Sequence, residues 1–480
     1  MYRARFHRWL IVCCATLFAA FSQTAAAKNL CVNPAGSHGC YSKIQTAVNH
    51  ASKNEVIDVE PGTYKEDVVI GISLSLIGDG ADSTVIDATG LPNGVFVDGF
   101  DNPGLHNVTV AGFTVKNALF EGILAVNTSD VTLRDNHILN NDASPGLFFT
   151  GLPVGCPGQP AFETDESGDC GGAVHLIGAV HTIVSDNLLT GNADGILISD
   201  ETAESRGNLV IHNIFKNNPL ECGITLASHP PMGSSAPYFA PHHGVDHNTV
   251  AENVSTGNGV QVGGAGVGLF SDGNGPGRVT DNVIIGNKLT GNGLGGVSLH
   301  THVGPAFHAP ADDMDGNKII GNFIAGNLAD QFDTATPGRV GININSGDGG
   351  SPVRGTVISQ NVIRDEDVDI AVNTPAEVDI HLNDLLGGKI GVADVCALDG
   401  STACTGAIDA IENYWGCPFG PGGAGCTTIS GSDIRFTPWF GHPIRDDDDR
   451  GHGDQDAINY HPTDGRRVAA LLVTKRSFLN

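Results

Sequence analysis

Short segments in which apolar and polar residues alternate recur along the chain, and each begins at a glycine. They read GILISD, GITLAS, GVGLFS, GVSLHT and GININS, at 195–200, 223–228, 266–271, 296–301 and 341–346. Alternation places successive side chains on opposite faces, as in β-strands with one buried face. When the segments are aligned on their glycines, the apolar residues that share one inward column are Ile196, Ile224, Val267, Val297 and Ile342. We therefore expect strands that stack in register.

A second repeat places asparagines five positions apart between these strands. The triplets are Asn208, Asn213 and Asn218; Asn248, Asn253 and Asn258; Asn282, Asn287 and Asn292; and Asn317, Asn322 and Asn327. The pieces between them, such as LVI, VII and KII, favour β-structure. Asparagine and glycine tolerate the left-handed backbone of a sharp corner, and asparagine side chains can stack in ladders from coil to coil. Three short strands joined by such corners predict one coil of a parallel β-solenoid.

The segment YSKIQTAVNHASK at 41–53 predicts a helix that caps the solenoid. Its apolar stripe is formed by Ile44, Ala47, Val48 and Ala51. Ser42 and Gln45 have the spacing of a capping box. A solenoid needs a cap because open sheet edges promote aggregation.

With these features the chain resembles the right-handed parallel β-helix proteins of the pectin-lyase-like superfamily. The resemblance rests on IQTAVNHASKNEVIDVEPGTYKEDVVI, the repeats with asparagine corners and IENYWGCPFGPGGAGC, and it covers roughly 41–440. Among these proteins the chain is most similar to the bacterial NosD-like repeat proteins. The resemblance implies an all-β, single-stranded parallel β-helix outside the cytoplasm. It also implies a carbohydrate lyase, hydrolase, esterase or epimerase, or an accessory protein of copper-enzyme maturation, because this fold carries many activities.

The first 27 residues have the features of a cleaved secretory signal. Arg3, Arg5 and Arg8 precede the apolar run WLIVCCATLFAAF, and TAAA precedes Lys28. The run is too short to predict a membrane span. We expect a signal peptide at 1–27, a β-helix domain at 28–440 and an acidic, flexible tail at 441–480, in a secreted or periplasmic protein whose mature chain has no transmembrane segment.

The chain is strongly acidic. It has 25 Lys and Arg against 53 Asp and Glu, a formal charge of −28, and loss of three arginines with the signal leaves 22 − 53 = −31. A field of this sign repels nucleic acid and anionic membranes. It also repels a polyuronate unless a cation bridges the two.

Export makes disulfides plausible, and the mature cysteines fall into close pairs. The pairs are Cys31 with Cys40, Cys156 with Cys170, Cys396 with Cys404, and Cys417 with Cys426. Each pair would close a short loop. Cys222 is left over, and we interpret it as a buried thiol beside a strand.

The candidate site lies where the glycine-led strands end. Their outgoing connections are long, at 201–207, 229–247, 272–281, 302–316 and 347–356, and long loops on one side of a repeat protein usually form its binding face. The outward column of the strands contains Ser199, Ala227, Phe270, His300 and Asn345. Two positions further on stand Glu201, His229, Asp272 and His302. Coils stack about 4.8 Å apart, so these four residues should form one ladder of acid and imidazole. His175 should also face outward.

Polysaccharide chemistry is the first function that fits this ladder. In β-elimination or C5-epimerisation, His229 or His302 would be the base. Glu201 and Asp272 would hold Ca²⁺, which stabilises the anion formed on the substrate. A hydrolase would instead use two carboxylates, Asp272 with Glu201 or with Asp313. Signatures of named pectinolytic families are missing: NTD, RIK and GRPW do not occur, and GHG occurs only at 451–453.

Two other functions stay open. The first is metal binding without sugar chemistry, for which the candidate ligands are His229, Asp272, His300, His302, Met232 and Met314. Imidazole and thioether together suit copper. The second is a structural solenoid or adhesin that binds glycans without turnover. We favour an exported protein that binds or acts on polysaccharide.

Overall fold

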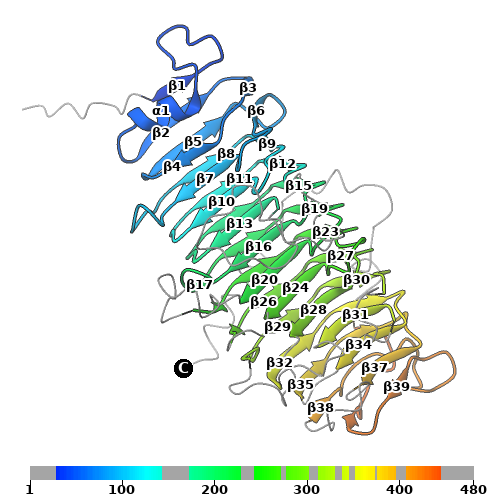
Figure 1. The fold of residues 1–480 in the computed structure, drawn as a ribbon. Helices are drawn as coiled ribbons and strands as arrows, with labels where there is room; N and C mark the ends of the chain where they lie inside the picture. The colour runs from blue at the N-terminus through cyan, green and yellow to red at the C-terminus, as the bar shows by residue number, and fades with distance from the viewer. Residues whose placement is uncertain are drawn as a thin grey trace, which may run out of the picture.

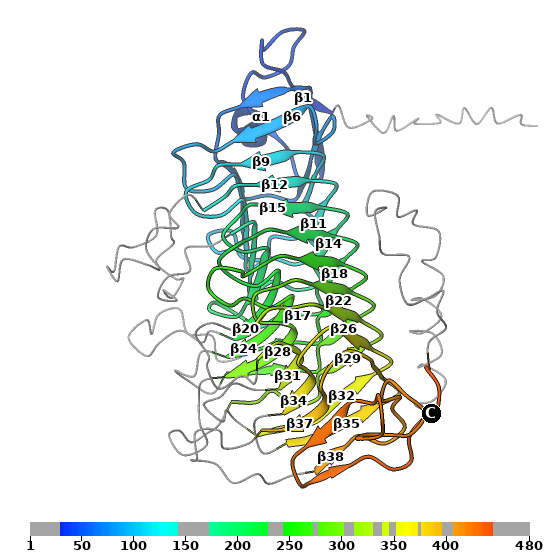
Figure 2. The ribbon, with the colours of Figure 1, turned by 90° about the vertical axis from the view of Figure 1, so that its right-hand side faces the viewer.

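The computed structural model describes residues 29–142, 172–228, 243–271, 277–301, 312–329, 338–344, 352–372, 376–395 and 407–444. Within these residues, successive strands follow a fixed cycle through three long parallel sheets, which we name A, B and C (Figure 1). Apart from β1 and β2, which pair with each other, each strand pairs with the corresponding strand of the next coil rather than with its neighbour in sequence. Viewed from the side, the coils stack into one elongated column (Figure 2). The predicted parallel β-helix is confirmed.

The described strands have the following bounds. Sheet A contains β1 (Leu30–Val32), β2 (Glu55–Val59), β5 (Leu74–Gly78), β8 (Thr109–Ala111), β11 (Thr132–Arg134), β14 (Ile183–Ser185), β18 (Leu209–Ile211), β22 (Thr249–Ala251), β26 (Val283–Ile285), β29 (Lys318–Ile320), β32 (Val353–Ser359), β35 (Ala376–His381), β38 (Ala407–Asp409) and β40 (Ile434–Arg435). Sheet B contains β3 (Gly62–Tyr64), β6 (Thr84–Asp87), β9 (Thr114–Lys116), β12 (His137–Leu139), β15 (Leu188–Thr190), β19 (Ile214–Lys216), β23 (Val254–Thr256), β27 (Lys288–Thr290), β30 (Phe323–Ala325), β33 (Val362–Arg364) and β36 (Asp384–Leu385). Sheet C contains β4 (Val68–Ile70), β7 (Val95–Asp98), β10 (Ile123–Val126), β13 (Val174–Ile177), β16 (Ile196–Ser199), β20 (Ile224–Ser228), β24 (Val267–Ser271), β28 (Gly295–Thr301), β31 (Val340–Ile344), β34 (Val368–Val372), β37 (Ile390–Asp394) and β39 (Thr428–Ser430). A small sheet D contains β17 (Ser205–Arg206), β21 (Val245–Asp246) and β25 (Val279–Thr280).

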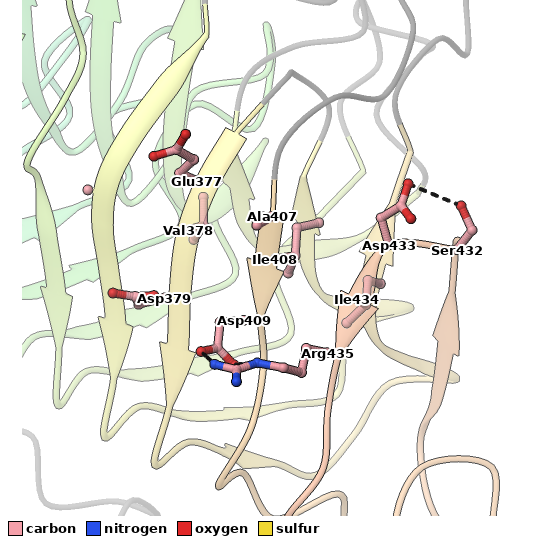
Figure 3. A pocket seen from close by; sticks show the side chains of 11 residues that line it. Glu377, Val378, Asp379, Ala407, Ile408, Asp409, Ser432, Asp433, Ile434 and Arg435 are labelled. Atoms are coloured by element: carbon pink, nitrogen blue, oxygen red, sulfur yellow. Dashed lines mark hydrogen bonds and ion pairs between the residues drawn. The ribbon is translucent and has the colours of Figure 1, made fainter.

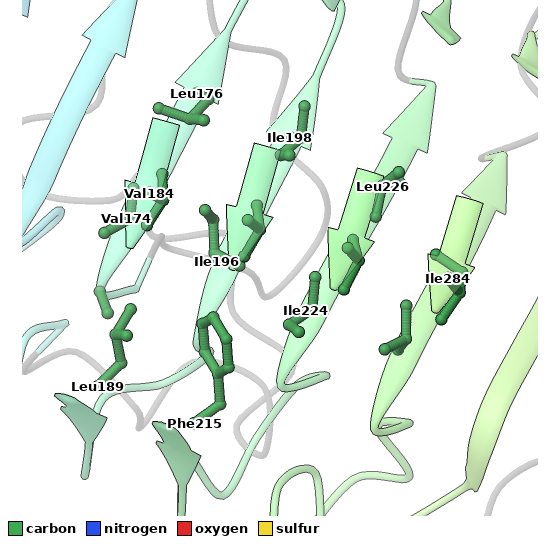
Figure 4. Close-up of a cluster of buried hydrophobic side chains, with 14 of the residues drawn as sticks. Val174, Leu176, Val184, Leu189, Ile196, Ile198, Phe215, Ile224, Leu226 and Ile284 are labelled. Carbon is green, nitrogen blue, oxygen red and sulfur yellow. The ribbon is translucent and has the colours of Figure 1, made fainter. Parts of the chain in front are cut away.

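The interior is a set of apolar columns. The predicted column of sheet C pairs in the expected register, from Ile196 through Ile224, Val267 and Val297 to Ile342. All five side chains are fully buried. Figure 4 shows Val174, Ile196 and Ile224 on successive strands, facing the side chains of the other sheets. Burial of such stacked apolar side chains is the main favourable contribution to the stability of the fold.

The asparagines form three buried ladders at the corners of the coils. The first contains Asn208, Asn248, Asn282 and Asn317. The second contains Asn136, Asn187, Asn213, Asn253, Asn287, Asn322, Asn361, Asn383 and Asn413. The third contains Asn141, Asn192, Asn218, Asn258, Asn292 and Asn327. In each, the side-chain amide donates to the next coil's side-chain oxygen, which satisfies polar groups that burial would otherwise leave unpaired. The predicted ladders are confirmed.

The left-handed residue of a corner is not the ladder asparagine itself, in contrast to our expectation. Asp186, His212 and Glu252 each stand one position before an asparagine of the second ladder, and their φ angles are 57°, 59° and 53°. The asparagine then turns its side chain inward. The outer residue of each corner therefore adopts the strained backbone, and the asparagine supplies the hydrogen bonds.

The predicted cap is a short helix, α1 (Ile44–His50), at the N-terminal end (Figure 1). Ile44, Ala47 and Val48 are buried, as the stripe predicts. The predicted capping box is wrong, because no side chain of the N-cap residue bonds the helix. Instead Glu66, from the following coil, accepts hydrogen bonds from the backbone N–H groups of Ile44 and Gln45, each at 2.9 Å.

Replacing Glu66 tests this arrangement. Glu66→Ala should lower the free energy of unfolding by about 1–2 kcal/mol, because two N–H groups at the start of the helix lose their acceptor. Chemical denaturation measures the change, and Lys65→Ala, at the adjacent exposed position, is the control. An unchanged Glu66→Ala protein would show that water replaces the carboxylate without cost.

Two of the predicted disulfides are present, Cys31–Cys40 and Cys417–Cys426. The Cys156–Cys170 and Cys396–Cys404 pairs lie outside the described residues and stay predictions. Cys222 is free, and its Sγ accepts a hydrogen bond from the backbone N–H of Ala265 at 3.1 Å. Burial, with a smaller contribution from Glu221, raises the pKa of this thiol to about 12.

We therefore expect Cys222 to resist thiol reagents in the folded protein. The thiolate is the reactive form, and so high a pKa leaves almost none of it at neutral pH. Labelling before and after denaturation, followed by mass spectrometry, measures this protection. Fast labelling of the native protein would contradict the burial of the thiol.

Among the described residues, no helix has the length and apolar character that a membrane crossing requires. Residues 1–28, which include the predicted signal peptide, and 445–480 of the predicted tail lie outside the described residues.

Candidate functional site

The register of sheet C brings together the positions that precede the predicted ladder. Ser199, Ala227, Phe270 and His300 stand opposite one another on β16, β20, β24 and β28. This alignment confirms the outward column as far as His300, whose side chain is not described. The ladder positions His229, Asp272 and His302 lie outside the described residues, as does Met232, so the ladder beyond Glu201 stays a prediction.

Glu201 is described, and it ends a chain of four side chains held by hydrogen bonds. His175 lies at the centre of this chain: its Nδ1 is 3.1 Å from Oε1 of Glu121, and its Nε2 is 2.8 Å from Oγ of Ser199. The Ser199 hydroxyl donates to Oε2 of Glu201 at 2.5 Å. We call the four residues Glu121, His175, Ser199 and Glu201 the histidine relay.

Three consecutive coils of sheet C position the relay. His175 on β13 stands opposite Leu124 of β10 on one side and Leu197 of β16 on the other. Val174 and Leu176 point into the core, so strand alternation turns the imidazole outward, as predicted. Glu121 precedes β10, and Ser199 ends β16.

The relay is buried although it lies on the outer side of the sheet. None of its four side chains is more than 1% exposed. Two further hydrogen bonds fix members of the relay: the N–H of Gly172 donates to Oε2 of Glu121 at 2.8 Å, and the hydroxyl of Ser205 donates to the backbone carbonyl of Ser199 at 2.5 Å. Ionisable groups remain at such depth only when partners compensate the loss of water.

A second polar chain adjoins the relay through Asp200, which is fully buried. Oδ2 of Asp200 accepts from the hydroxyl of Ser228 at 2.8 Å and lies 3.2 Å from Nδ1 of His243. The backbone N–H of Arg278 donates to the same serine hydroxyl at 3.0 Å. The sequence Ser199–Asp200–Glu201 thus carries two buried carboxylates, each linked to a different histidine.

Such an arrangement can accept and release protons. A carboxylate that bonds one imidazole nitrogen fixes the tautomer, and the other nitrogen is then directed at the hydroxyl. The hydroxyl connects the imidazole to a second carboxylate, so proton transfer along the chain needs no large movement of atoms. Buried acid–base groups of this kind concentrate at functional sites.

Sequence reasoning missed Glu121, and it placed Ser199 in the outward column without proposing a role for it. The signal is partial: Gly122 and Gly195 stand directly before β10 and β16, and Ala173 takes the corresponding place before β13. Aligning these three positions places Glu121 and His175 on neighbouring coils. The loop between them hides the relation because it is longer than the other repeats.

Two further candidates have other surroundings. Met314, proposed as a copper ligand, is fully buried in the hydrophobic core, where its thioether packs among apolar side chains. Asp313, the alternative hydrolase carboxylate, is exposed and lies with Asp281, Asp315 and Arg278 around a surface cavity of about 340 Å³. The described chain therefore does not join Met314 to the relay.

A larger groove lies on sheet A near the C-terminal end, with a volume of about 700 Å³ (Figure 3). Asp379, His381 and Asp409 bring one potential ligand atom each within 4.8 Å of one another. Arg435, however, bonds both oxygens of Asp409. Although burial acts in the opposite direction, this guanidinium holds the pKa of Asp409 below its ordinary value. The ion pair uses the carboxylate that a cation would need, so the groove is the weaker candidate.

The comparisons agree with the architecture. A family model described as right handed beta helix region matches residues 81–235, which include the whole relay. The chain has the fold of a right-handed parallel β-helix, and the family model matches less than half of its length. No curated protein matches it at a significant level. The finer similarity to NosD-like proteins stays a prediction.

Solved structures with a similar course of the chain come from several kinds of protein. The catalytic unit of a GH87 α-1,3-glucanase from Streptomyces thermodiastaticus is 16% identical with a TM-score of 0.45, and the match covers 84% of this chain and 66% of the glucanase unit. The A-module of the mannuronan C-5 epimerase AlgE6 of Azotobacter vinelandii is 14% identical with a TM-score of 0.47, covering 82% and 94%. PfbA, a surface adhesin of Streptococcus pneumoniae, is 13% identical with a TM-score of 0.46, covering 73% and 82%. The β-helix protein thus spans slightly less than two thirds of the glucanase unit. At these values the likeness does not identify an activity.

Proposed function

We propose that this β-helix protein is exported and acts on a polysaccharide at the outer face of sheet C, by lyase or epimerase chemistry that uses the histidine relay for acid–base catalysis. The observation that carries the proposal is the buried hydrogen-bonded chain from Glu121 to Glu201. It lies on the side of the solenoid where the long connections leave sheet C, which is the expected binding face of a repeat protein.

The chemistry needs a group that takes a proton and a group that returns one. In β-elimination, a base removes the proton at C5 of a uronate, the C4–O bond breaks, its electrons stay on the leaving oxygen, and that oxygen must be protonated. In epimerisation, the same proton is removed and another is delivered to the opposite face of C5. Glu201, at the loop end of the relay, is 1% exposed, so exchange of the proton with the substrate would require its carboxylate to become accessible when the substrate binds. His175 and Glu121 would supply and take up the proton through Ser199.

The charge of the protein limits the substrate. With 53 acidic and 25 basic residues, the protein repels a polyuronate. Binding of such a substrate would require a bridging divalent cation, and Ca²⁺ is the natural choice for carboxylate ligands. A neutral polysaccharide would not need a cation, but it has no carboxylate beside C5 and could not undergo this chemistry. Turnover that depends on Ca²⁺ therefore supports a polyuronate substrate, and turnover of a neutral polysaccharide would indicate hydrolysis.

The test is incubation of the purified protein with alginate, polygalacturonate and a neutral β-glucan, with Ca²⁺ and with EDTA. Ultraviolet absorbance detects unsaturated products, proton NMR detects epimerisation, and a reducing-end assay detects hydrolysis. Glu201→Gln and His175→Gln should each reduce turnover by about 10²–10⁴-fold, the usual contribution of acid–base catalysis. Glu252→Gln, at an outer corner beside His212, is the matched control and should keep full activity.

Three other results would each contradict the proposal and indicate a different function. Retention of the protein in an affinity gel that contains the polysaccharide, without any product, would indicate a glycan-binding solenoid. Bound copper in the purified protein, lost in the double variant His229→Ala and His302→Ala, would indicate a metal-binding accessory protein. Hydrolysis without unsaturated product would indicate a carboxylate pair and not the relay.

A further inference from the structure

The outer face of sheet A carries an apolar patch in the middle of the solenoid. The central residues of its strands, such as Val184 and Ile284, are fully buried in the core, so the residues on either side of them point outward. On β14, β18, β26 and β29 most of these outward residues are aliphatic: Ile183, Leu209, Ile211, Val283, Ile285 and Ile320. We call these six residues the sheet A patch. Between them, β22 contributes the smaller Thr249 and Ala251. Ile183 is 40% exposed, and the other five residues of the patch are half-buried.

The patch is confined to neighbouring coils. In the same outward columns, Thr132 and Arg134 precede it on β11, and Asp379 and His381 follow it on β35. Figure 2 shows β14, β18, β22, β26 and β29 side by side along the column of coils. Contiguous apolar surface of this kind marks a contact with another segment or another molecule.

Acidic residues border the patch. Asp186 and Glu252 occupy the corners at which β14 and β22 end, and Asp281 occupies the corner that leads into β26. Lys318 on β29 is the basic side chain beside Ile320, and the acidic corners outweigh it. The border therefore favours a partner that carries positive charge.

The surface cavity of about 340 Å³ adjoins this border at Asp281. Asp281, Asp313 and Asp315 line it together with Arg278. The guanidinium of Arg278 already bonds two carboxylates outside the cavity, those of Glu204 and Asp246. The three carboxylates of the cavity thus leave an excess of negative charge at the edge of the patch.

One segment of the chain has the complementary pattern. The sequence RRVAALLVTKR at 466–476 places six apolar residues, 468–473, between two pairs of basic residues. No acidic residue follows Asp464. The segment therefore has positive charge in a protein that is otherwise strongly acidic.

We propose that residues 466–476 dock on the sheet A patch, with the apolar residues on the aliphatic side chains and the basic residues against the acidic border. Six extended residues cover about 20 Å, and five strands spaced by about 4.8 Å cover about 19 Å. The described chain ends close by: the N–H of Ile444 donates to Oδ1 of Asp384 on β36 at 2.8 Å. β36 lies two coils beyond the coil of β29 and β30, about 10 Å along the solenoid. Residues 445–465 are long enough to cross that distance.

The charge of the border argues against a second copy of the chain as the occupant. Contact between the sheet A patches of two copies would bring acidic corners against acidic corners. The tail segment brings arginine and lysine to the same corners. Docking would also remove the apolar patch from water.

Hydrogen–deuterium exchange of the full-length protein, followed by mass spectrometry of peptides from 466–476, tests the proposal. In the wild type these amides should exchange about tenfold or more slowly than in the double variant Leu471→Asp with Leu472→Asp. Ile285→Asp, in the patch, should accelerate their exchange to the same extent. Ile214→Asp makes the same change at a residue that is 36% exposed on sheet B, and it should leave the tail protected. The double tail variant tests the contact even where Ile285→Asp disturbs folding.

The protection should not change when the protein is diluted tenfold, because the contact lies within one chain. Tail amides that exchange equally fast in the wild type and in the double tail variant would overturn the proposal. Equal acceleration by Ile285→Asp and Ile214→Asp would also overturn it, since the sheet A patch would not be the docking surface. Protection that is lost on dilution, together with a dimeric mass in light scattering, would show that a second copy is the occupant. None of these results depends on the histidine relay or on turnover.

Discussion

Replacing a single ladder asparagine, Asn213→Ala, should lower the free energy of unfolding by about 3 kcal/mol or more. Asn213 accepts from the backbone N–H and the side-chain amide of Asn187, at 3.0 and 2.9 Å, and donates to the Val184 carbonyl at 2.8 Å and to Asn253 at 3.1 Å. Truncation leaves the buried N–H of Asn187 without this acceptor. A loss of that size is a large part of the 5–15 kcal/mol typical of a folded domain.

The loss should also be localised. In a solenoid each coil contacts only its neighbours, so amide hydrogen exchange should accelerate most in the coils on either side of the substitution. Lys216→Ala on the same coil, where the side chain is exposed, is the control and should stay within about 0.5 kcal/mol of the wild type. Equal stability of the two variants would show that water fills the place of the asparagine side chain.

The ladders illustrate why the fold was predictable from sequence. The glycine-led strands and the asparagine spacing are both local patterns, and both repeat because every coil has the same three corners. Their period sets the register, which the pairing of Ile196 with Ile224 confirms. What the period does not determine is which corner residue is left-handed, since the asparagine and its predecessor occur together in every repeat.

The Met314 prediction was misled because it used the neighbours of this residue in sequence instead of its position in the repeating coil. Met314 stands three positions before Asn317, as Val245 and Val279 stand before Asn248 and Asn282, and all three precede a ladder asparagine as core residues. Its position therefore predicted burial, and its proximity to histidines in sequence was misleading. The predicted capping box was wrong for another reason. The acceptor of the first N–H groups of the helix is Glu66, which belongs to the next coil, and capping rules consider only residues next to the helix in sequence.

The site was predictable only in part. Strand alternation correctly turned His175 outward and placed Ser199 in the outward column. The link between them depends on side-chain conformations, which no periodicity encodes. Glu121 was harder to predict, because the long segment between β12 and β13 separates it in sequence from His175, its partner on the next coil.

Near the C-terminal end, the third asparagine ladder ends on a carboxyl group. Oε1 of Glu366 accepts from both the backbone N–H and the side-chain amide of Asn327, each at 3.0 Å, as an asparagine oxygen does elsewhere. Burial raises the pKa of Glu366 to about 7, against which the bonds from Asn327 act only in part. Asp369 is fully buried nearby; burial first, and then the charge of Glu366, raise the pKa of Asp369 well above its ordinary value.

These carboxyls should make the protein less stable as the pH rises. A carboxyl whose pKa is higher in the folded state binds its proton more tightly there, so its contribution is greatest below the unfolded value of 4.5 and is lost as the pH rises through about 7. This difference between the folded and the unfolded pKa of Glu366 corresponds to about 3 kcal/mol. Glu366→Gln keeps an oxygen for Asn327 and cannot ionise. It should match the wild type near pH 4 and exceed it in stability at pH 8.

The neighbouring Asp367 provides a control of opposite sign. Hydrogen bonds from Arg339, at 3.2 and 3.4 Å, hold the pKa of Asp367 below its ordinary value. Its contribution is present above the unfolded pKa and is lost as the pH falls, so Asp367→Asn should cost stability at pH 8 and less at pH 4. Melting temperatures of both variants across this range separate the two carboxyls. If Glu366→Gln were less stable than the wild type at pH 8, the ionised carboxylate would stabilise the end of the ladder, and the folded pKa of Glu366 would lie below its unfolded value instead of above it.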